Sequence, residues 1–368
     1  MSQTEVQLIK NGAVVDADIN GMSSSKLSGA LPAISGASLT NLPAGAGKAK
    51  NLIINGDMQI AQRNTSDQVS SSAVGYKTLD RWRYSKHGSP TAVYNMTKDT
   101  DHPDGFSASL KLATATADAA MAAGDSTYID YQIESQDLQQ LAYGTSSAKS
   151  LTLSFHVKST VTGTYVIWIY SVDLGKALQK TYTISAQNTW EKKTITISGD
   201  TATALGNDSE AGLMLRWILS TGTDYTSGTA YNTWNALAIS PIANRYVGHT
   251  ANVAATTSDN WAIAGVQLEL GDEATDFEYK TVAEQLFLCQ RYFKKQGYTL
   301  YGGRYSSSSG FVQHYHNPEM RAIPSFNWTG RATSTGWNYA SYSDNKVFQV
   351  LMTATSPYIQ GGTWDAEL

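Results

Sequence analysis

The chain has 368 residues, of which 41% are hydrophobic, so it can bury the cores of two or three domains. Only 16% of its residues are charged, where an average soluble domain has about 25%, and the formal net charge is -4. No cluster of lysines and arginines is present that would neutralise a phosphate backbone or an anionic bilayer. These features argue against nucleic acid and membranes as partners.

The single cysteine, Cys289, excludes an intrachain disulfide and fits folding in a reducing cytoplasm. Pairing between chains stays open, but a free, buried thiol is favoured. The N-terminus, MSQTEVQLIKNG, lacks the apolar segment of a signal peptide, and no run of about 18 apolar residues occurs. We therefore expect a protein that is made soluble in a cytoplasm.

Residues 1–48 differ in composition from the rest of the chain. They carry Gly, Ala, Ser and Pro at close intervals and no aromatic residue, so this segment cannot build a core alone. Spaced aliphatic residues favour a segment ordered by neighbouring copies of itself over a disordered linker. We expect this segment to tether the protein and to help it trimerise. The aliphatic residues are Leu27, Leu31, Ile34, Leu39 and Leu42.

Residues 49–280 show repeated strand patterns. Residues 151–159 alternate between apolar and polar, as in a half-solvated antiparallel strand, and residues 165–170 are apolar on both faces, as in a central strand. Within residues 261–270 the apolar positions change parity at Gly265, which predicts a β-bulge. Turn-rich loops, with no crossover helices, favour a two-sheet sandwich of the jelly-roll type.

One helix is predicted over residues 281–293, and it opens the third part of the chain, residues 281–368. Thr281 can cap the helix, and Glu284 follows at the spacing of a capping box. Beyond the helix, polar and aromatic residues alternate between Gly and Ser turns, so we expect a small distal β domain. The apolar stripe predicted to face the core is Val282, Leu286, Cys289 and Phe293.

Several phrases, taken together, resemble phage tail-fibre and receptor-binding proteins, particularly those of marine and cyanobacterial phages. In addition, NPEMRAIPSF near residue 320 looks like the beginning of the terminal module of such proteins, and GASLTNLPA resembles the shafts of trimeric fibres. Residues 325–368 show no such resemblance. The phrases within residues 51–293 are NLIINGDMQIAQR, TLDRWRY, SQDLQQLAYGTSSAKSLTLSFHVKS, NTWEKKTITI, DNWAIAGVQLELG and LCQRYF.

The resemblance implies a homotrimeric fibre of the virion, assembled in the host cytoplasm. Its N-terminal segment would dock to tail or baseplate proteins, and its distal tip would meet a host-surface polysaccharide. The expected fold is all-β: an extended N-terminal fibre segment, a central β-sandwich jelly roll like that of carbohydrate-binding modules, a short helix and a small distal β domain.

Exposed aromatic residues in turns are the candidate glycan contacts, because the apolar face of a sugar stacks on a ring while nearby polar groups bind its hydroxyls. Exposure is therefore the property that selects them, although each residue alone is more often structural. Three lie in one loop of the central domain and five in the distal module. They are Tyr225, Tyr231, Trp234, Tyr301, Tyr305, Trp337, Tyr339 and Tyr342.

Catalysis would require paired carboxylates in one cleft, or a nucleophile with its base, and the sequence picks out neither. We predict no catalytic residue and no cofactor. A depolymerase would also normally bring the regular repeats of a long β-helix, which are absent. A structural baseplate or fibre-network protein stays open as the alternative, and a polysaccharide depolymerase is less favoured. The densest carboxylate cluster is interpreted as a solvated turn: Glu269, Asp272, Glu273, Asp276 and Glu278.

The sequence suggests two metal sites, and neither is favoured. Asp57 with Glu269 or Asp272 would offer oxygen ligands to a structural calcium ion. His314 and His316 share one strand face, so three copies of the chain could surround an axial metal, as in some phage fibres. Two exposed polar side chains are the favoured interpretation of this pair.

The tripeptide Asp80-Arg81-Trp82 would suit a sugar-stacking platform, because a ring stands next to two hydrogen-bonding side chains. Core packing of Trp82 is the favoured interpretation. Asp80 and Arg81 are then expected to form an ion pair at the rim of the domain.

Overall fold

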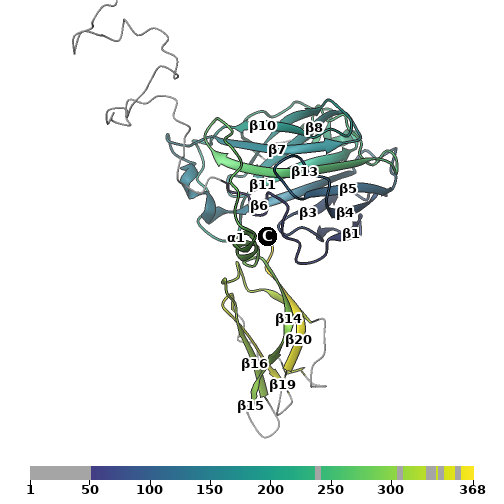
Figure 1. Ribbon diagram of the computed structural model, residues 1–368. Helices are drawn as coiled ribbons and strands as arrows, with labels where there is room; N and C mark the ends of the chain where they lie inside the picture. Colours follow the sequence, from purple (N-terminus) through teal and green to yellow (C-terminus); the bar gives the residue numbers. More distant parts are fainter. Residues whose placement is uncertain (1–50, 237–241, 305–309, 329–336, 339–343, 353–357) are drawn as a thin grey trace, which may run out of the picture. The chain divides into compact units, whose positions relative to one another are not determined.

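The computed structural model describes residues 51–236, 242–304, 310–328, 337–338, 344–352 and 358–368 (Figure 1). The elements below all belong to one unit of the chain, Gly47–Leu368. The expected attachment segment, residues 1–48, lies outside the described residues. Within the described ranges, no helix is long and apolar enough to cross a membrane.

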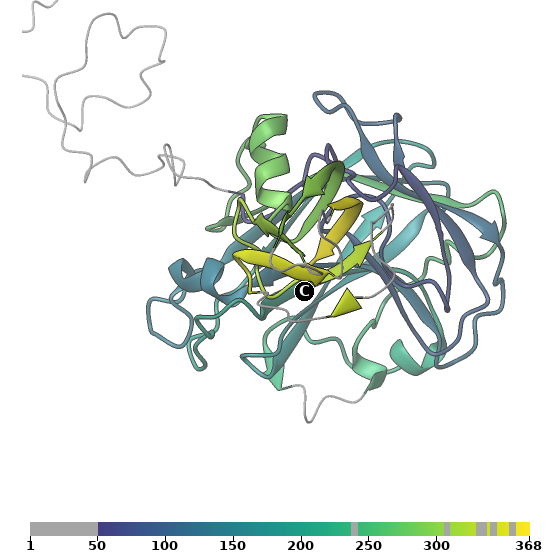
Figure 2. The same cartoon turned by 90° about the horizontal axis from the view of Figure 1, so that it is seen from below.

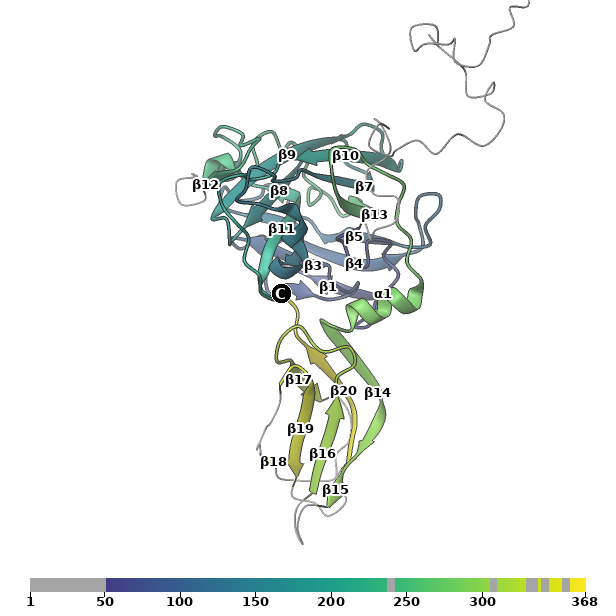
Figure 3. The ribbon, with the colours of Figure 1, turned by 90° about the vertical axis from the view of Figure 1, so that its left-hand side faces the viewer.

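Two antiparallel sheets packed face to face form the sandwich (Figures 1 and 3). The six-stranded sheet has the order β1 (Ser66–Val69), β4 (Val93–Asp99), β5 (Ser109–Thr116), β13 (Asn260–Leu270), β7 (Leu151–Ser159) and β10 (Glu191–Ile197). The seven-stranded sheet has the order β12 (Asn235–Ala236), β9 (Lys176–Ile184), β8 (Gly163–Ser171), β11 (Ala211–Thr221), β6 (Ser126–Glu134), β3 (Arg83–His87) and β2 (Gly75–Tyr76). The all-β sandwich expected from the sequence is thus present. Short 3₁₀ turns interrupt the loops at Ser135–Leu141, Thr223–Tyr225 and Ile242–Asn244.

Aromatic rings fill the space between the sheets. Trp82 is fully buried and lies 5.1 Å from Tyr131 and 5.6 Å from Trp217 between ring centroids. Phe155 of β7 meets the same Trp217 edge-on at 6.0 Å. Rings of this size bury more apolar area than any aliphatic side chain, so they dominate the core. The prediction that Trp82 packs in the core is confirmed.

The prediction for β7 is correct for its inner face and wrong for part of its outer face. The inner positions, among them Phe155, are fully buried. On the other face Thr152 is 0% exposed and Ser154 is 4% exposed, where solvent was expected. Residues that follow β13 cover this end of the sheet, and the Thr152 hydroxyl donates to the carbonyl of Gly271 at 2.7 Å.

The bulge predicted in β13 is confirmed. The register of β13 against β7 shifts between Ala264 and Gln267, and Gly265 has a φ of 59°. A Cβ atom on Gly265 would lie 2.4 Å from the ring of Phe106, so the position combines a left-handed backbone with a close packing contact. The bulge lets residues on both sides of Gly265 turn toward the core.

The chain turns at Asn55-Gly56-Asp57, and this turn is buried. Asn55 has a φ of 60° and 0% exposure. Its side chain accepts from the amide of Ile60 at 2.8 Å and donates to the carbonyls of Ile60 and Asp80, both at 2.9 Å. A Cβ atom on Gly56 would lie 2.1 Å from the carbonyl oxygen of Val266 in β13. The turn therefore anchors the first described residues inside the sandwich.

Helix α1 spans Val282–Cys289, and the capping box of Thr281 and Glu284 is confirmed. The predicted apolar stripe is wrong in part, because Val282 is 59% exposed and Phe293 begins the next strand. The buried face is instead Gln285 and Cys289. Gln285 accepts from the amide of Asn55 and donates to Asp57, so the helix packs on the buried turn through polar contacts. Burial raises the pKa of the Cys289 thiol, which fits the predicted buried thiol.

The distal module consists of two small antiparallel sheets (Figures 1 and 2). One contains β14 (Phe293–Tyr301), β20 (Tyr358–Asp365) and β17 (Ser325–Trp328), and the other contains β15 (Gly303–Arg304), β16 (Gly310–Tyr315), β19 (Val347–Met352) and β18 (Trp337–Asn338). The two sheets share a core made of Val312, Met320, Phe348, Ile359, Trp364 and Ala366. The division into parts at residues 48 and 280 stays a prediction.

Candidate functional site

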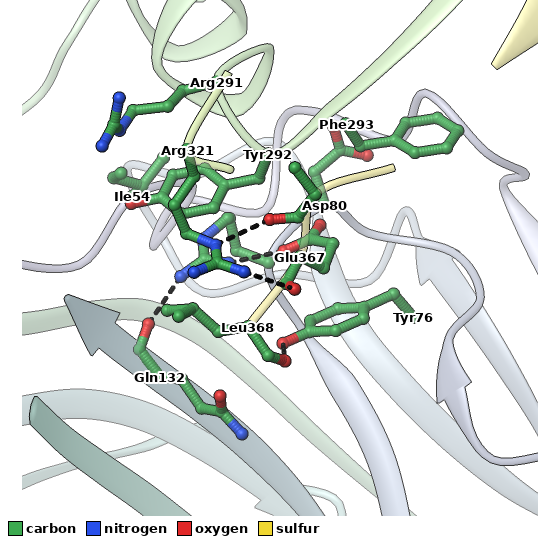
Figure 4. A network of polar contacts seen from close by, with 12 residues as sticks. Ile54, Tyr76, Asp80, Gln132, Arg291, Tyr292, Phe293, Arg321, Glu367 and Leu368 are labelled. Atoms are coloured by element: carbon green, nitrogen blue, oxygen red, sulfur yellow. Dashed lines mark hydrogen bonds and ion pairs between the residues drawn. The ribbon is translucent and has the colours of Figure 1, made fainter. Parts of the chain in front are cut away.

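The last residues of the chain return to the sandwich and fix the distal module to it (Figure 4). The Glu367 carboxylate accepts from Arg81 at 2.5 Å and from Arg63 at 3.2 Å. The side chains of Arg81, Arg63 and Glu367 are 1%, 9% and 4% exposed. Although burial alone lowers the pKa of Arg81, the Glu367 carboxylate raises it well above the ordinary value. The Tyr76 hydroxyl donates to the carbonyl of Leu368 at 2.9 Å.

A second set of buried charges ties the beginning of the distal module to the sandwich. Glu134 at the end of β6 is 0% exposed and accepts two hydrogen bonds from Arg291, at 3.1 and 2.8 Å. It also accepts from the Tyr292 hydroxyl at 2.5 Å. The Arg81 guanidinium stands 3.5 Å from the ring centroid of Tyr292. Contacts of both the first and the last residues of the distal module therefore fix it to the sandwich.

This junction corrects the prediction for Asp80 and Arg81, which do not form a rim ion pair. Asp80 is 0% exposed and accepts from the backbone amide of Gln62 at 2.9 Å and from its side chain at 2.5 Å. Arg81 turns to Glu367 instead. Burial raises the pKa of Asp80 to about 6. A sequence interval of 286 residues separates the two partners of the Arg81 ion pair, so no local pattern indicates it.

A cleft of about 290 Å³ lies at one edge of the distal module, and we call it the β14–β16 cleft. Strands β14, β16 and β20 supply most of its walls. Among its lining residues are ammonium, amide, imidazole and aromatic groups, which is the mixture that binds sugar hydroxyls and faces. The lining residues are Gln290, Lys294, Lys295, Gln296, His314, Tyr315, Asn317 and Trp364.

The imidazoles near this cleft pack on Trp364 rather than facing solvent. The rings of His314 and Trp364 stack at 4.8 Å, and His316 meets Trp364 edge-on at 5.4 Å. His316 is 7% exposed. Burial lowers the pKa of both histidines, that of His316 to about 4, with further lowering from Lys294. Both rings are therefore neutral near neutral pH.

This packing corrects the favoured interpretation of His314 and His316 as two exposed polar side chains. They do share one strand face, as the alternation predicted, and their ring centroids are 5.4 Å apart. That face, however, points into the core of the distal module, where the large ring of Trp364 packs against both imidazoles. An axial metal shared by three copies would need the imidazoles at the surface, and the buried His316 contradicts it.

Tyr315 is the exposed aromatic residue of the cleft, with 67% of its surface accessible. It projects to the side of β16 opposite His314, and its hydroxyl accepts from the Gln313 amide at 3.2 Å. It was not among our predicted glycan contacts. Alternation placed Tyr315 on the strand face opposite the two histidines but did not show which of the two faces is exposed.

The predicted contacts in the central domain are largely structural. Tyr225 is only 7% exposed, and its ring stacks between His87 at 5.4 Å and Tyr246 at 5.2 Å. The expectation that Tyr225 is exposed is wrong, because its loop folds over the outer face of the seven-stranded sheet. Tyr231 is half-buried, and so is Trp234, whose indole donates to the carbonyl of Ser198 at 2.7 Å. Trp234 also packs against the sandwich core.

In the distal module, Tyr301 has the expected exposure. It is 80% exposed, and its ring centroid lies 6.2 Å from that of Tyr358. It does not line the β14–β16 cleft. Trp337 lies in β18, but its side chain lies outside the described residues, as do Tyr305, Tyr339 and Tyr342 entirely.

The carboxylates that the sequence offers for calcium or catalysis do not converge. Glu269 is 2% exposed and accepts from the amide and hydroxyl of Thr275, so it is not part of a solvated turn as expected. Asp272 is exposed and accepts from the hydroxyl of Ser150, while Asp57 accepts from Gln285 near helix α1. Within the described ranges, no group of three or more His, Cys, Asp or Glu side chains is placed to hold a metal ion.

Comparisons with known proteins give similarity in structure alone. No protein-family model and no curated protein sequence matches the chain. Among solved structures, carbohydrate-binding modules recur. The family 11 module of a cellulosomal cellulase from Clostridium thermocellum is 9% identical, covers 58% of this chain and 98% of that one, and has a TM-score of 0.28. The C-terminal family 22 module from the same organism is 10% identical over 52% and 88%, with a TM-score of 0.26.

A phage protein is also among the similar structures. The enzymatically active domain of tailspike protein 4 from bacteriophage CBA120 is 15% identical, with a TM-score of 0.32. The match covers 60% of this chain and 21% of that one, so the chain spans about a fifth of the length of the tailspike domain.

Proposed function

We propose that the protein is a non-catalytic adhesin that binds a glycan in the β14–β16 cleft of its distal module. The observation that carries this proposal is Tyr315, a 67% exposed lining residue of a cleft whose other lining residues include three amides and two lysines. A sugar would stack its apolar face on the ring and place its hydroxyls against those groups. Among the described residues no carboxylate lines the cleft, so the paired acids of a glycosidase are not in these walls.

The biological setting belongs to the same proposal and rests on the tail-fibre phrases in residues 51–293. In this setting the protein is a phage tail fibre or receptor-binding protein of the virion, and its target is a host-surface polysaccharide. Residues 1–48 would dock to tail or baseplate proteins. The junction around Glu367 supports this role, because an adhesin must pass the force of attachment from its tip to its body.

The glycan proposal is tested with full-length protein on host cells or on their isolated surface polysaccharide. We expect Tyr315→Ala to weaken binding about tenfold, which corresponds to about 1.4 kcal/mol of lost stacking. Tyr301→Ala is the matched control, because this exposed tyrosine of the same module lies outside the cleft. A loss on Tyr301→Ala with none on Tyr315→Ala would move the site to Tyr301.

The two rival functions give different results in the same experiment. If the wild-type protein binds neither cells nor polysaccharide, a structural role in the baseplate or fibre network becomes the better conclusion. If the polysaccharide becomes shorter on incubation with the protein, the protein is a depolymerase.

We also propose that the protein acts as a homotrimer. A single shallow sugar site with a Kd near 1 mM contributes only about 4 kcal/mol. Linked sites raise the overall avidity by roughly 10²–10⁴. The exposed apolar residues Tyr279, Val282 and Phe287 near helix α1 support contact with a second copy, since exposed apolar patches tend to mark interfaces. Light scattering of the full chain should give the mass of three chains, and a monomer would contradict the proposal.

A further inference from the structure

Lys294 is a buried cation that has no carboxylate partner in the described part of the chain. It lies on the inward face of β14 and is 8% exposed, while its neighbour Lys295 is exposed. Its ammonium donates to the carbonyl of Asn317 at 2.8 Å, and the ion pairs found among the described residues do not include it. Burying an ammonium is costly unless an opposite charge or several hydrogen bonds compensate it. The distal module therefore keeps an unfavourable buried charge in the wall of an open cleft.

The other walls of the cleft strengthen the positive field around Lys294. Lys295 adds a second ammonium, and the remaining side chains are amides, an imidazole and two aromatic rings. The whole chain has 31 acidic residues and 27 lysines and arginines, yet no acidic residue of the described ranges lines this cleft. A cleft lined by one sign of charge attracts ligands of the opposite sign.

Buried nitrogen atoms without partners belong to two lining residues of the cleft, His314 and Trp364, and to His316, which packs against both. Nε2 of His314 and Nε1 of Trp364 have no hydrogen-bond partner among the residues that the structure describes, and neither ring nitrogen of His316 has one. Buried polar atoms in native proteins are normally paired, so unpaired ones call for an explanation. An indole nitrogen only donates, so Trp364 lacks an acceptor. A neutral imidazole has one donor and one acceptor nitrogen, so the N–H of His316 also lacks an acceptor.

We propose that the β14–β16 cleft binds a sugar that carries an oxyanion, such as the carboxylate of a uronic acid, and that Lys294 is the cation that pairs with it. This inference rests on the proposed glycan-binding function and names the class of its ligand. An ammonium has three donors, so Lys294 can keep its bond to Asn317 and still donate to the ligand. Tyr315 then holds the face of the same sugar or of its neighbour.

The affinity should depend on pH, because neutral imidazoles lie next to the anion. The charged and titratable groups around these rings are Lys294 from β14, the two histidines themselves, and Asp344 before β19. In the free protein, burial holds the pKa of His316 at about 4. A bound anion raises the pKa of both histidines, so binding takes up protons and strengthens as the pH falls below neutrality. Burial lowers the pKa of Lys294, so binding should weaken in alkaline solution.

Calorimetry with the full-length chain tests the proposal. The probes are a galacturonic acid oligosaccharide, the neutral galactose oligosaccharide of the same length, and inorganic phosphate. We expect the acidic oligosaccharide to bind at least about tenfold more tightly than the neutral one, and more tightly at about pH 5 than at about pH 7. Lys294→Met should remove the preference for the acidic oligosaccharide over the neutral one. Lys346→Met, at a side chain that is 64% exposed, should leave this preference unchanged.

The outcomes separate this inference from the proposed function. Equal affinity for the acidic and neutral oligosaccharides would overturn the oxyanion and leave the glycan adhesin standing. If phosphate binds as tightly as the acidic oligosaccharide, the cleft is an anion site that does not recognise the sugar. That result would also contradict the proposed function. Binding of neither oligosaccharide overturns the inference. If Lys294→Met fails to fold, the pH profile of the wild-type chain decides, because an affinity that does not rise in acid contradicts the proposal.

Discussion

Replacing Glu367 by glutamine should lower the free energy of unfolding by about 3–5 kcal/mol, because it leaves the buried Arg81 guanidinium without its anion and removes one of the two carboxylates paired with Arg63. Arg81 and Arg63 both pair with this carboxylate, and their side chains are 1% and 9% exposed. The measurement is equilibrium unfolding in urea at neutral pH. Glu319→Gln is the matched control, because Glu319 is 46% exposed and its ion pair with Lys346 spans 3.8 Å. This control should change stability by less than about 1 kcal/mol.

If Glu367→Gln unfolds like the control, the ion pairs of Glu367 do not stabilise the junction, and the contacts of Glu134 with Arg291 and Tyr292 must hold the distal module instead. Because of these buried ion pairs, a truncated protein that ends at residue 280 is a poor choice for locating the proposed glycan site. Such a protein would lack Glu367, Arg291 and Tyr292, so Arg81 and Glu134 would lose their buried partners. Point variants in the full chain avoid this loss.

Replacing Asn55 by alanine should cost about 3–6 kcal/mol of unfolding free energy. The change removes the side-chain bonds to both backbone groups of Ile60 and to the carbonyl of Asp80, all in a buried place. Each buried polar group left without a partner costs about 1–3 kcal/mol. Alanine also tolerates the φ of 60° less well than asparagine, at a cost of about 1 kcal/mol.

The control for this variant is Asn188→Ala. Asn188 has a similar φ of 54° but is exposed, so it reports the backbone cost alone. We expect it to lose about 1 kcal/mol in the same urea experiment. Equal losses at the two positions would show that the buried side-chain bonds of Asn55 contribute nothing.

The sequence predicts those parts of the fold that depend on neighbours along the chain. Alternation identifies the inner face of β7, the change of parity at Gly265 identifies the bulge, and the spacing of Thr281 and Glu284 identifies the cap of α1. Each of these signals lies within about ten residues, and each reports a local backbone geometry.

The sequence of a strand or loop does not show which other parts of the chain cover it. Tyr225 sits in a turn-rich loop, yet Tyr246 and His87 enclose its ring. His316 looks like a solvent-facing residue of a strand, yet Trp364 lies against it from β20. Alternation separates the two faces of a strand but does not say which face is covered in a small two-sheet module. For this reason the sequence predicts candidate contacts in the distal module without identifying Tyr315, the exposed aromatic residue that lines the cleft.

The register of β14 against β20 has a consequence for how the distal module could be replaced. Phe293, where β14 begins, pairs directly with Asp365, where β20 ends. The segment between them thus leaves and re-enters the sandwich at one point, and the residues that anchor it lie at that point. Domains whose two ends are adjacent are readily exchanged or inserted. A different β module with the same two ends could make the same contacts with the sandwich, so the distal module could be replaced as a unit without changes to the sandwich.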